Sequence, residues 1–248
     1  MRYLFQVSYL GTRYHGWQSQ ANAVGVQDVI EDALSRLLRK DISIVGSGRT
    51  DTGVHCTKQF FHADIGHEIR EQSLMQRLNA FLPKDIAVHA IQKIKPDAHA
   101  RYDAFERAYL YKITRVKDPL QVGLAYHFFK EMDLKTMNKA AALLVGTHDF
   151  QCFSKVKTDV NHFLCEVKKA QWAESDHQMV FNIVANRFLR GMVRAIVGSL
   201  LDVGTGKSTI NGFKELIDSK DRKKAGMNVP PEGLYLVDVK YPKGIFLK

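Results

Sequence analysis

The fold is decided by residues 42–65, which read ISIVGSGRTDTGVHCTKQFFHADI. Two β-rich runs, 42–45 and 59–65, flank a loop with three glycines, which allow backbone conformations that a Cβ forbids. The loop carries Arg49 two residues before Asp51. A neighbouring guanidinium favours the ionised form of a carboxylate, so Asp51 is a candidate nucleophile or base. The alternative interpretation is a loop salt bridge or an Asx-turn.

A strand and a helix precede this loop. Apolar and aromatic residues alternate with other residues over 3–9, which predicts a strand, and apolar residues recur at helical spacing over 26–38. The chain up to the loop is therefore a strand, helix, strand unit. A second helix is expected from Leu74 to a stop at Pro83, followed by a strand over 86–94.

The second part of the chain repeats this pattern in outline. The patterns predict strands over 109–115, 167–172 and 178–184 and helices over 134–145 and 187–203. We therefore expect two similar α/β halves, residues 1–103 and 104–248, with the join near 96–103 and a cleft between them.

Composition restricts the class of protein. The 248 residues are 45% hydrophobic, which suffices for a packed core, and a net charge of +10 indicates an anionic partner such as nucleic acid. Three widely spaced cysteines without a C-x-x-C motif indicate neither a disulfide framework nor a zinc site, and favour a reducing cytoplasm. No apolar run approaches the ~20 residues that span a bilayer, so we expect no membrane association.

Clustered arginines and aromatic residues suggest contacts with RNA. Arg187, Arg190 and Arg194 would share one face of the helix over 187–203, as a surface for phosphates or as an ordinary solvated face. Trp17 and Arg101 lie in stretches where aromatic and basic residues alternate, a pattern that suits unpaired bases and phosphates.

Two short motifs match other classes of protein only in part. Residues 204–208, GTGKS, resemble the end of a phosphate-binding loop, but Leu201 stands where that motif requires glycine. Residues 51–53, DTG, match the signature of aspartic proteases, whose mechanism needs two carboxylates. Because the chain has no second such motif, it could be an aspartic protease only as a dimer in which each chain supplies one carboxylate. The histidines show no metal-ligand spacing, so we expect no metal.

Residues 48–55, GRTDTGVH, closely resemble the catalytic loop of the tRNA pseudouridine synthase A family. Further matches follow in order along the chain: 14–18, 78–83 with 85–86, 99–101, the strand bearing Tyr109 and Tyr111, 192–194 with 196–198, and 232–236. One of the two tyrosines is expected to pack in the core. The chain departs from the family pattern at Cys56, where a small residue such as alanine is expected, and at Arg187 and Arg190, which resemble variable positions.

The resemblance implies the pseudouridine synthase fold, an α+β fold of two α/β halves with antiparallel sheets and helices flanking a central basic cleft. It implies a homodimeric, cytoplasmic enzyme that needs no cofactor and converts uridine to pseudouridine at positions 38, 39 and 40 of the tRNA anticodon stem-loop.

The resemblance also assigns roles to residues. Asp51 matches the catalytic aspartate, Tyr109 the tyrosine that packs on the target base, Arg194 the arginine that pairs with the catalytic acid, and Arg49 the arginine that holds the target nucleotide out of the helix. Leu234 is expected, with Val54, to form an apolar wall that excludes water.

The chemistry requires that uracil leave C1′ of the ribose, turn and rejoin through C5, so the base cannot stay stacked in RNA. Asp51 could attack C1′ or C6, or abstract a ribose proton, and the sequence leaves these routes open. A non-catalytic RNA-binding protein that uses the same basic cleft is the alternative function.

Overall fold

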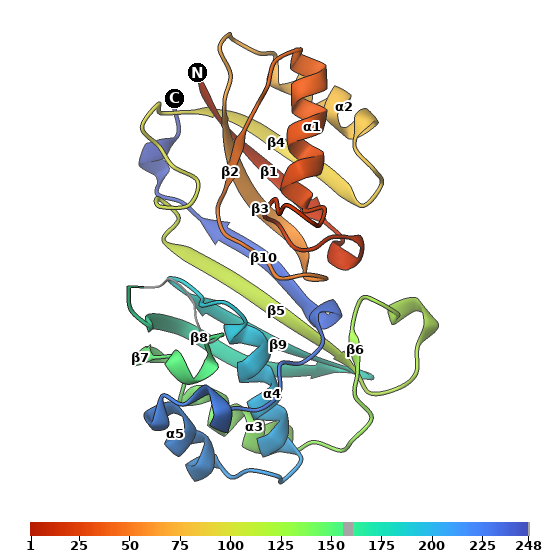
Figure 1. Cartoon of the computed structure of the whole chain (residues 1–248). Helices are drawn as coiled ribbons and strands as arrows, with labels where there is room; N and C mark the ends of the chain where they lie inside the picture. Colours follow the sequence, from red (N-terminus) through yellow and green to blue (C-terminus); the bar gives the residue numbers. More distant parts are fainter. Residues whose placement is uncertain (156–160, 248) are drawn as a thin grey trace. The chain divides into compact units, whose positions relative to one another are not determined.

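The computed structural model describes residues 1–155 and 161–247. The chain divides into two compact units: unit 1 comprises Met1–Glu106 and Tyr235–Lys248, and unit 2 comprises Arg107–Leu234 (Figure 1). This division differs from the predicted halves, residues 1–103 and 104–248, because the end of the chain from Tyr235 onward belongs to unit 1. The return depends on strand pairing between residues far apart in sequence, which local patterns do not encode.

Unit 1 contains a sheet with the strand order β4-β1-β3-β10, and β2 pairs with β3. The strands are β1 Arg2–Tyr9, β2 Ile44–Gly46, β3 His55–Asp64, β4 Ile86–Ile94 and β10 Leu234–Lys240. β1 lies antiparallel to both β3 and β4, β2 is antiparallel to β3, and β10 runs parallel to β3 with Tyr235 opposite His55. The loop that contains Asp51 therefore joins two strands of this sheet.

Two helices pack beside each other in unit 1, α1 (Val26–Leu38) and α2 (Glu71–Phe81) (Figure 1). The Asp28 carboxylate accepts a hydrogen bond from the Gly25 N–H at 2.7 Å, which caps the start of α1. α2 ends at Phe81, because Pro83 disfavours helical backbone at the residue before it, Leu82, which is extended. The stacked rings of Phe5 and Phe61, 4.7 Å apart, lie in the core of this unit.

Unit 2 contains a sheet with the order β5-β9-β8-β7, and β6 pairs parallel with β5. Its strands are β5 Glu106–Thr114, β6 Tyr126–His127, β7 Gly146–Asp149, β8 Leu164–Ser175 and β9 Gln178–Ala185, and its helices are α3 Leu134–Ala142, α4 Met192–Gly204 and α5 Ile210–Ser219. The three helices lie together (Figure 1), and α4 is buried along almost its whole length, as its apolar sequence demands.

Six short 3₁₀ helices complete the described elements: Gly11–Arg13, Pro119–Gln121, Gln151–Phe153, Arg222–Lys224, Pro231–Gly233 and Lys243–Ile245. With a mostly antiparallel sheet and helices in each unit, the described chain is an α+β protein, as the family resemblance implies.

The prediction of one helix over 187–203 is wrong at its beginning. α4 begins at Met192, and Gly191 before it adopts φ +74°, a left-handed conformation that interrupts a helix. Arg187 and Arg190 therefore precede the helix, and they do not share a helical face with Arg194.

Candidate functional site

The Asp51 loop, residues 47–54, connects β2 to β3 in unit 1. Thr50 is buried, whereas Asp51 is half-buried and Arg49 is exposed. The Val54 N–H donates to the Asp51 carbonyl at 3.1 Å, which closes a turn. Gly53 in that turn has φ +78°, a conformation that glycine adopts without strain. The loop thus presents one carboxylate from a fixed turn.

A second segment, residues 9–17, holds this loop from one side. Trp17 donates its backbone N–H to the Thr50 carbonyl at 3.3 Å, and the Gly53 N–H donates to the Tyr14 carbonyl at 3.2 Å. The Tyr9 hydroxyl lies 2.8 Å from that of Thr50. We call residues 9–17 the clamp segment, because it contacts the loop on both sides of Asp51.

Two glycines allow the clamp segment to approach the loop. A Cβ on Gly11 would lie 2.0 Å from the Val54 carbonyl oxygen, and one on Gly16 would lie 2.3 Å from the Thr50 carbonyl oxygen. Both distances are far inside van der Waals contact with backbone atoms. These positions therefore require glycine because of close packing, and at Gly16 because of φ +85° as well.

The clamp segment is itself anchored to the start of β4. Tyr14 donates its hydroxyl to the Asp85 carboxylate at 2.6 Å, and the Leu10 N–H donates to the Asp85 carbonyl at 2.9 Å. Burial, followed by the hydrogen bond to Asp85 and its negative charge, raises the pKa of Tyr14 above its ordinary value. Tyr14 therefore stays a neutral donor at physiological pH.

His55 closes the loop at the first position of β3. Its Nδ1 accepts a hydrogen bond from the Gly11 N–H at 2.9 Å, and its ring lies 4.7 Å from the ring of Tyr235 on β10. The side chain is fully buried. His55 thus ties the clamp segment to the loop and is a structural partner that the sequence analysis did not identify.

Trp17 does not form a surface for stacking bases, contrary to the prediction. Its side chain is 2% exposed, and its ring packs 6.0 Å from the rings of Tyr9 and Phe61. The edge of the indole also fills the space beside Gly46. Burial of this large apolar ring is favourable in free energy, so Trp17 anchors the clamp segment to the core.

Arg101 lies on an exposed turn of unit 1. The backbone N–H groups of Arg101 and Tyr102 both donate to Nδ1 of His99, at 3.1 and 3.3 Å. The Arg101 guanidinium carbon lies 5.7 Å from the centre of the Tyr102 ring, in cation–π range. The turn places an arginine and an aromatic ring side by side, and the contact of Arg101 with RNA stays a prediction.

Tyr109 and Tyr111 lie on β5 in unit 2 and differ in environment. Tyr111 is fully buried and donates its hydroxyl to the Pro230 carbonyl at 2.8 Å, so it is the core member of the pair. Tyr109 is half-buried, with its ring 5.0 Å from Phe188 at an interplanar angle of 84°. The edge contact with Phe188 fixes the orientation of the Tyr109 ring.

Arg194 lies in the first turn of α4 and is anchored to the segment before β10. Its Nε donates to the Val229 carbonyl at 2.6 Å, and the Val229 N–H donates to the Arg194 carbonyl at 3.3 Å. Leu234, the first residue of β10, is buried. Both Arg194 and Leu234, the last residue of unit 2, belong to that unit.

The other two predicted arginines lie in the segment between β9 and α4. Arg187 reaches His162 with Nη1 3.4 Å from the imidazole Nε2, and the Arg190 carbonyl accepts a hydrogen bond from the Lys155 N–H at 2.9 Å. Arg190 is exposed and Arg187 half-buried. Any contact of this pair with RNA would come from a loop and not from a helix.

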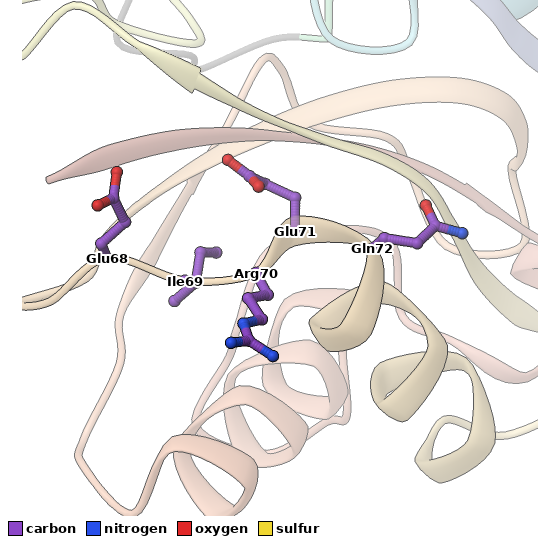
Figure 2. A pocket seen from close by; sticks show the side chains of 5 residues that line it. All are labelled: Glu68, Ile69, Arg70, Glu71 and Gln72. Atoms are coloured by element: carbon purple, nitrogen blue, oxygen red, sulfur yellow. The ribbon is translucent and has the colours of Figure 1, made fainter.

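A surface pocket in unit 1 lies away from the Asp51 loop. Residues 68–72 line it where β3 leads into α2, and Figure 2 shows Glu68, Arg70 and Glu71 spread along the chain around it. The Asp51 loop precedes β3 and this pocket follows it, so the length of the strand, about 30 Å, separates them. None of the predicted site residues lines it.

Within residues 1–155 and 161–247, no group of three or more metal-ligating side chains is arranged to hold a metal ion. Over the same part of the chain, no helix has the length and apolar character needed to cross a bilayer.

Comparison with known proteins identifies the family. A family model described as tRNA pseudouridine synthase matches residues 6–103 and 140–242. The chain is 45% identical over 250 residues to tRNA pseudouridine synthase A of Porphyromonas gingivalis, covering 99% of each chain. It is 46% identical over 246 residues to the protein of that name from Parabacteroides distasonis, covering 99% of this chain and 98% of the other. The relative from Colwellia psychrerythraea is 38% identical, with 100% and 96% covered. This chain therefore belongs to the tRNA pseudouridine synthase family.

Proposed function

We propose that this protein isomerises uridine to pseudouridine in tRNA, with Asp51 as the nucleophile. The observation that carries the proposal is the Asp51 loop, which offers a single carboxylate from a turn held by the clamp segment. Catalysis by a carboxylate requires such fixed geometry. The family model and the relatives named tRNA pseudouridine synthase A support the same reaction.

The proposed substrate region is the anticodon stem-loop, with uridines 38, 39 and 40 as targets. This finer assignment rests on the resemblance of residues 48–55 to the family's catalytic loop. The net charge of +10 fits a polyanionic substrate.

The reaction needs uracil to leave C1′ and to rejoin through C5, with its N1 replaced by C5 in the bond to the ribose. Asp51 would act at C1′, at C6 or on a ribose proton. Tyr109 would pack on the detached base and Arg194 would keep the Asp51 carboxylate ionised and oriented. The fixed ring of Tyr109 and the doubly anchored Arg194 are suited to these roles.

Arg49 would engage the flipped nucleotide, and Val54 and Leu234 would exclude water that could otherwise hydrolyse the intermediate. The exposure of Arg49 and the burial of both apolar residues support this division of roles. Arg101, Arg187 and Arg190 would add contacts to phosphates.

The experiment that tests this function is incubation with an unmodified tRNA transcript, followed by mapping of pseudouridine. We expect product at one or more of positions 38 to 40. A non-catalytic RNA-binding protein would bind the transcript without forming product, and an aspartic protease would cleave peptides at low pH. Either result would contradict the proposed function.

We also propose a homodimer and a cytoplasmic location, as the resemblance implies. Sedimentation of the purified protein would test the first, and fractionation of the source cell would test the second.

A further inference from the structure

Tyr9 and Thr50 form a buried hydrogen-bonded pair next to Asp51. Tyr9 is the last residue of β1, an inner strand of the sheet, and its hydroxyl lies 2.8 Å from that of Thr50. The two residues are 3% and 9% exposed. Thr50 directly precedes Asp51, so this bond connects the sheet to the residue before the carboxylate.

Burial makes this bond effective as a restraint. A buried hydroxyl left without a partner costs about 1–3 kcal/mol, so each hydroxyl holds the other in place. The Tyr9 ring is fixed by its position opposite Cys56 and Ile86 on the two neighbouring strands, and by the Trp17 ring at 6.0 Å. The Thr50 side chain therefore meets a hydroxyl that two neighbouring strands and the Trp17 ring hold in position.

The backbone at Asp51 is held on both sides as a result. Thr50 is bound through its side chain by Tyr9 and through its carbonyl by the Trp17 N–H. On the other side, the Asp51 carbonyl accepts the Val54 N–H. Since threonine has restricted χ1 freedom, fixing its hydroxyl also fixes the backbone from which the Asp51 side chain projects.

We propose that Tyr9 is a positioning residue for Asp51 that acts through the Thr50 hydroxyl. The inference rests on the proposed function, in which Asp51 attacks the substrate. In this scheme Tyr9 sets the position of the loop and takes no part in the bond changes. Its effect is geometric, and a displacement of about 1 Å in a reacting group can lower a rate about 100-fold.

The test compares Tyr9→Phe, Thr50→Val and the double variant, each of which removes the bond and keeps the shape of the side chain. We expect each single variant to lower the single-turnover rate of pseudouridine formation at least about tenfold. The Kd for the tRNA transcript should stay within about twofold, because no RNA contact is removed. The double variant should be no slower than the slower single variant, since all three lack the same bond.

Two further variants separate positioning from simple structural loss. Thr50→Ser keeps the hydroxyl and should retain nearly the wild-type rate. Tyr3→Phe is the matched control, because Tyr3 is also buried on β1 and its hydroxyl accepts the Ile69 N–H at 3.3 Å, at the opposite end of the strand. It should lower thermal stability about as much as Tyr9→Phe while leaving the rate unchanged.

A wild-type rate in Tyr9→Phe would overturn the positioning role. So would parallel losses of rate and tRNA affinity, or additive losses in the double variant. The Asp51→Asn variant distinguishes this failure from failure of the proposed function: a fully active Asp51→Asn protein contradicts the nucleophile itself, whereas an inactive one beside a fully active Tyr9→Phe protein contradicts only the role of Tyr9.

Discussion

Arg194 and Val229 bind each other reciprocally, with the Arg194 Nε 2.6 Å from the Val229 carbonyl oxygen and the Val229 N–H donating to the Arg194 carbonyl at 3.3 Å. This double contact fixes the arginine at the start of α4. It also brings residues 226–229 against the helix, where the Met227 carbonyl oxygen occupies the space of a Cβ on Gly198.

We expect Arg194→Lys to lower the single-turnover rate about 100-fold, because lysine keeps the charge but loses the Nε donor and the planar fork. The rate on a tRNA transcript checks this expectation. Arg115→Lys serves as the control and should cost less than about threefold, since Arg115 pairs with Glu174 at the surface and has no role in the proposed reaction. A near-wild-type rate in Arg194→Lys would show that charge alone suffices and that the anchored geometry does not matter.

Gly11→Ala should destabilise the protein by about 1–3 kcal/mol, because the new methyl group would meet the Val54 carbonyl oxygen and force the clamp segment away from the Asp51 loop. Chemical denaturation measures this change, and the isomerisation rate should fall with it. Gly48→Ala, in the Asp51 loop, is the matched control, since no atom lies within 4 Å of its added Cβ. A destabilisation at Gly48 as large as that at Gly11 would refute the packing argument.

Stability should fall as the pH drops from about 6.5 toward 4, partly because of His62. Burial first, then the positive charge of Arg2 and the neighbouring His99, lowers the pKa of His62 to about 4, although Asp64 and Asp103 oppose the shift. Its Nδ1 accepts the Ala100 N–H at 3.1 Å, which requires an unprotonated nitrogen.

The unfolded chain binds a proton at His62 below about pH 6.5 and the folded chain does not, so the free energy of unfolding decreases through this window by up to about 3 kcal/mol. Urea denaturation between pH 7 and 4 measures the slope. His62→Gln should flatten it, and an unchanged slope in that variant would exclude His62 as the cause.

The three cysteines should be inert in the native protein. All are buried, and burial raises the pKa of Cys152 to about 12, that of Cys165 to about 11 and that of Cys56 as well. A thiol-reactive dye at pH 8 should therefore label them only after denaturation. Rapid labelling of Cys56 in the folded protein would contradict its place in β3, where its side chain is 2% exposed.

Local patterns predict much of this fold from the sequence. The helix over 26–38 and the strand over 86–94 are confirmed at both ends, because apolar spacing and a flanking glycine or proline define them. α5 and β10 were not predicted. β10 takes its place through parallel pairing with β3, a contact between residues about 180 positions apart that no local pattern can show.

The site was less fully predictable than the fold. The sequence singles out the Asp51 loop by its glycines and charges, but Tyr9 and His55 act through partners far away in the chain. Gly11 and Gly16 are the available signal, since two glycines within a short loop indicate close approach of backbone. The prediction that Trp17 contacts bases is wrong because an aromatic residue in a stretch with basic residues can equally be buried, as Trp17 is.

The role of Asp51 as nucleophile can be tested by the single-turnover yield of pseudouridine on an unmodified tRNA transcript with wild-type protein and with Asp51→Asn, alongside their Kd values for that transcript. We expect product from the wild type, none from the variant, and Kd values that agree within about threefold, because asparagine keeps the shape of the side chain and removes only the carboxylate. Asp41→Asn, an exposed neighbour that precedes β2, should behave as wild type. Full product formation by Asp51→Asn would show that Asp51 is not the nucleophile.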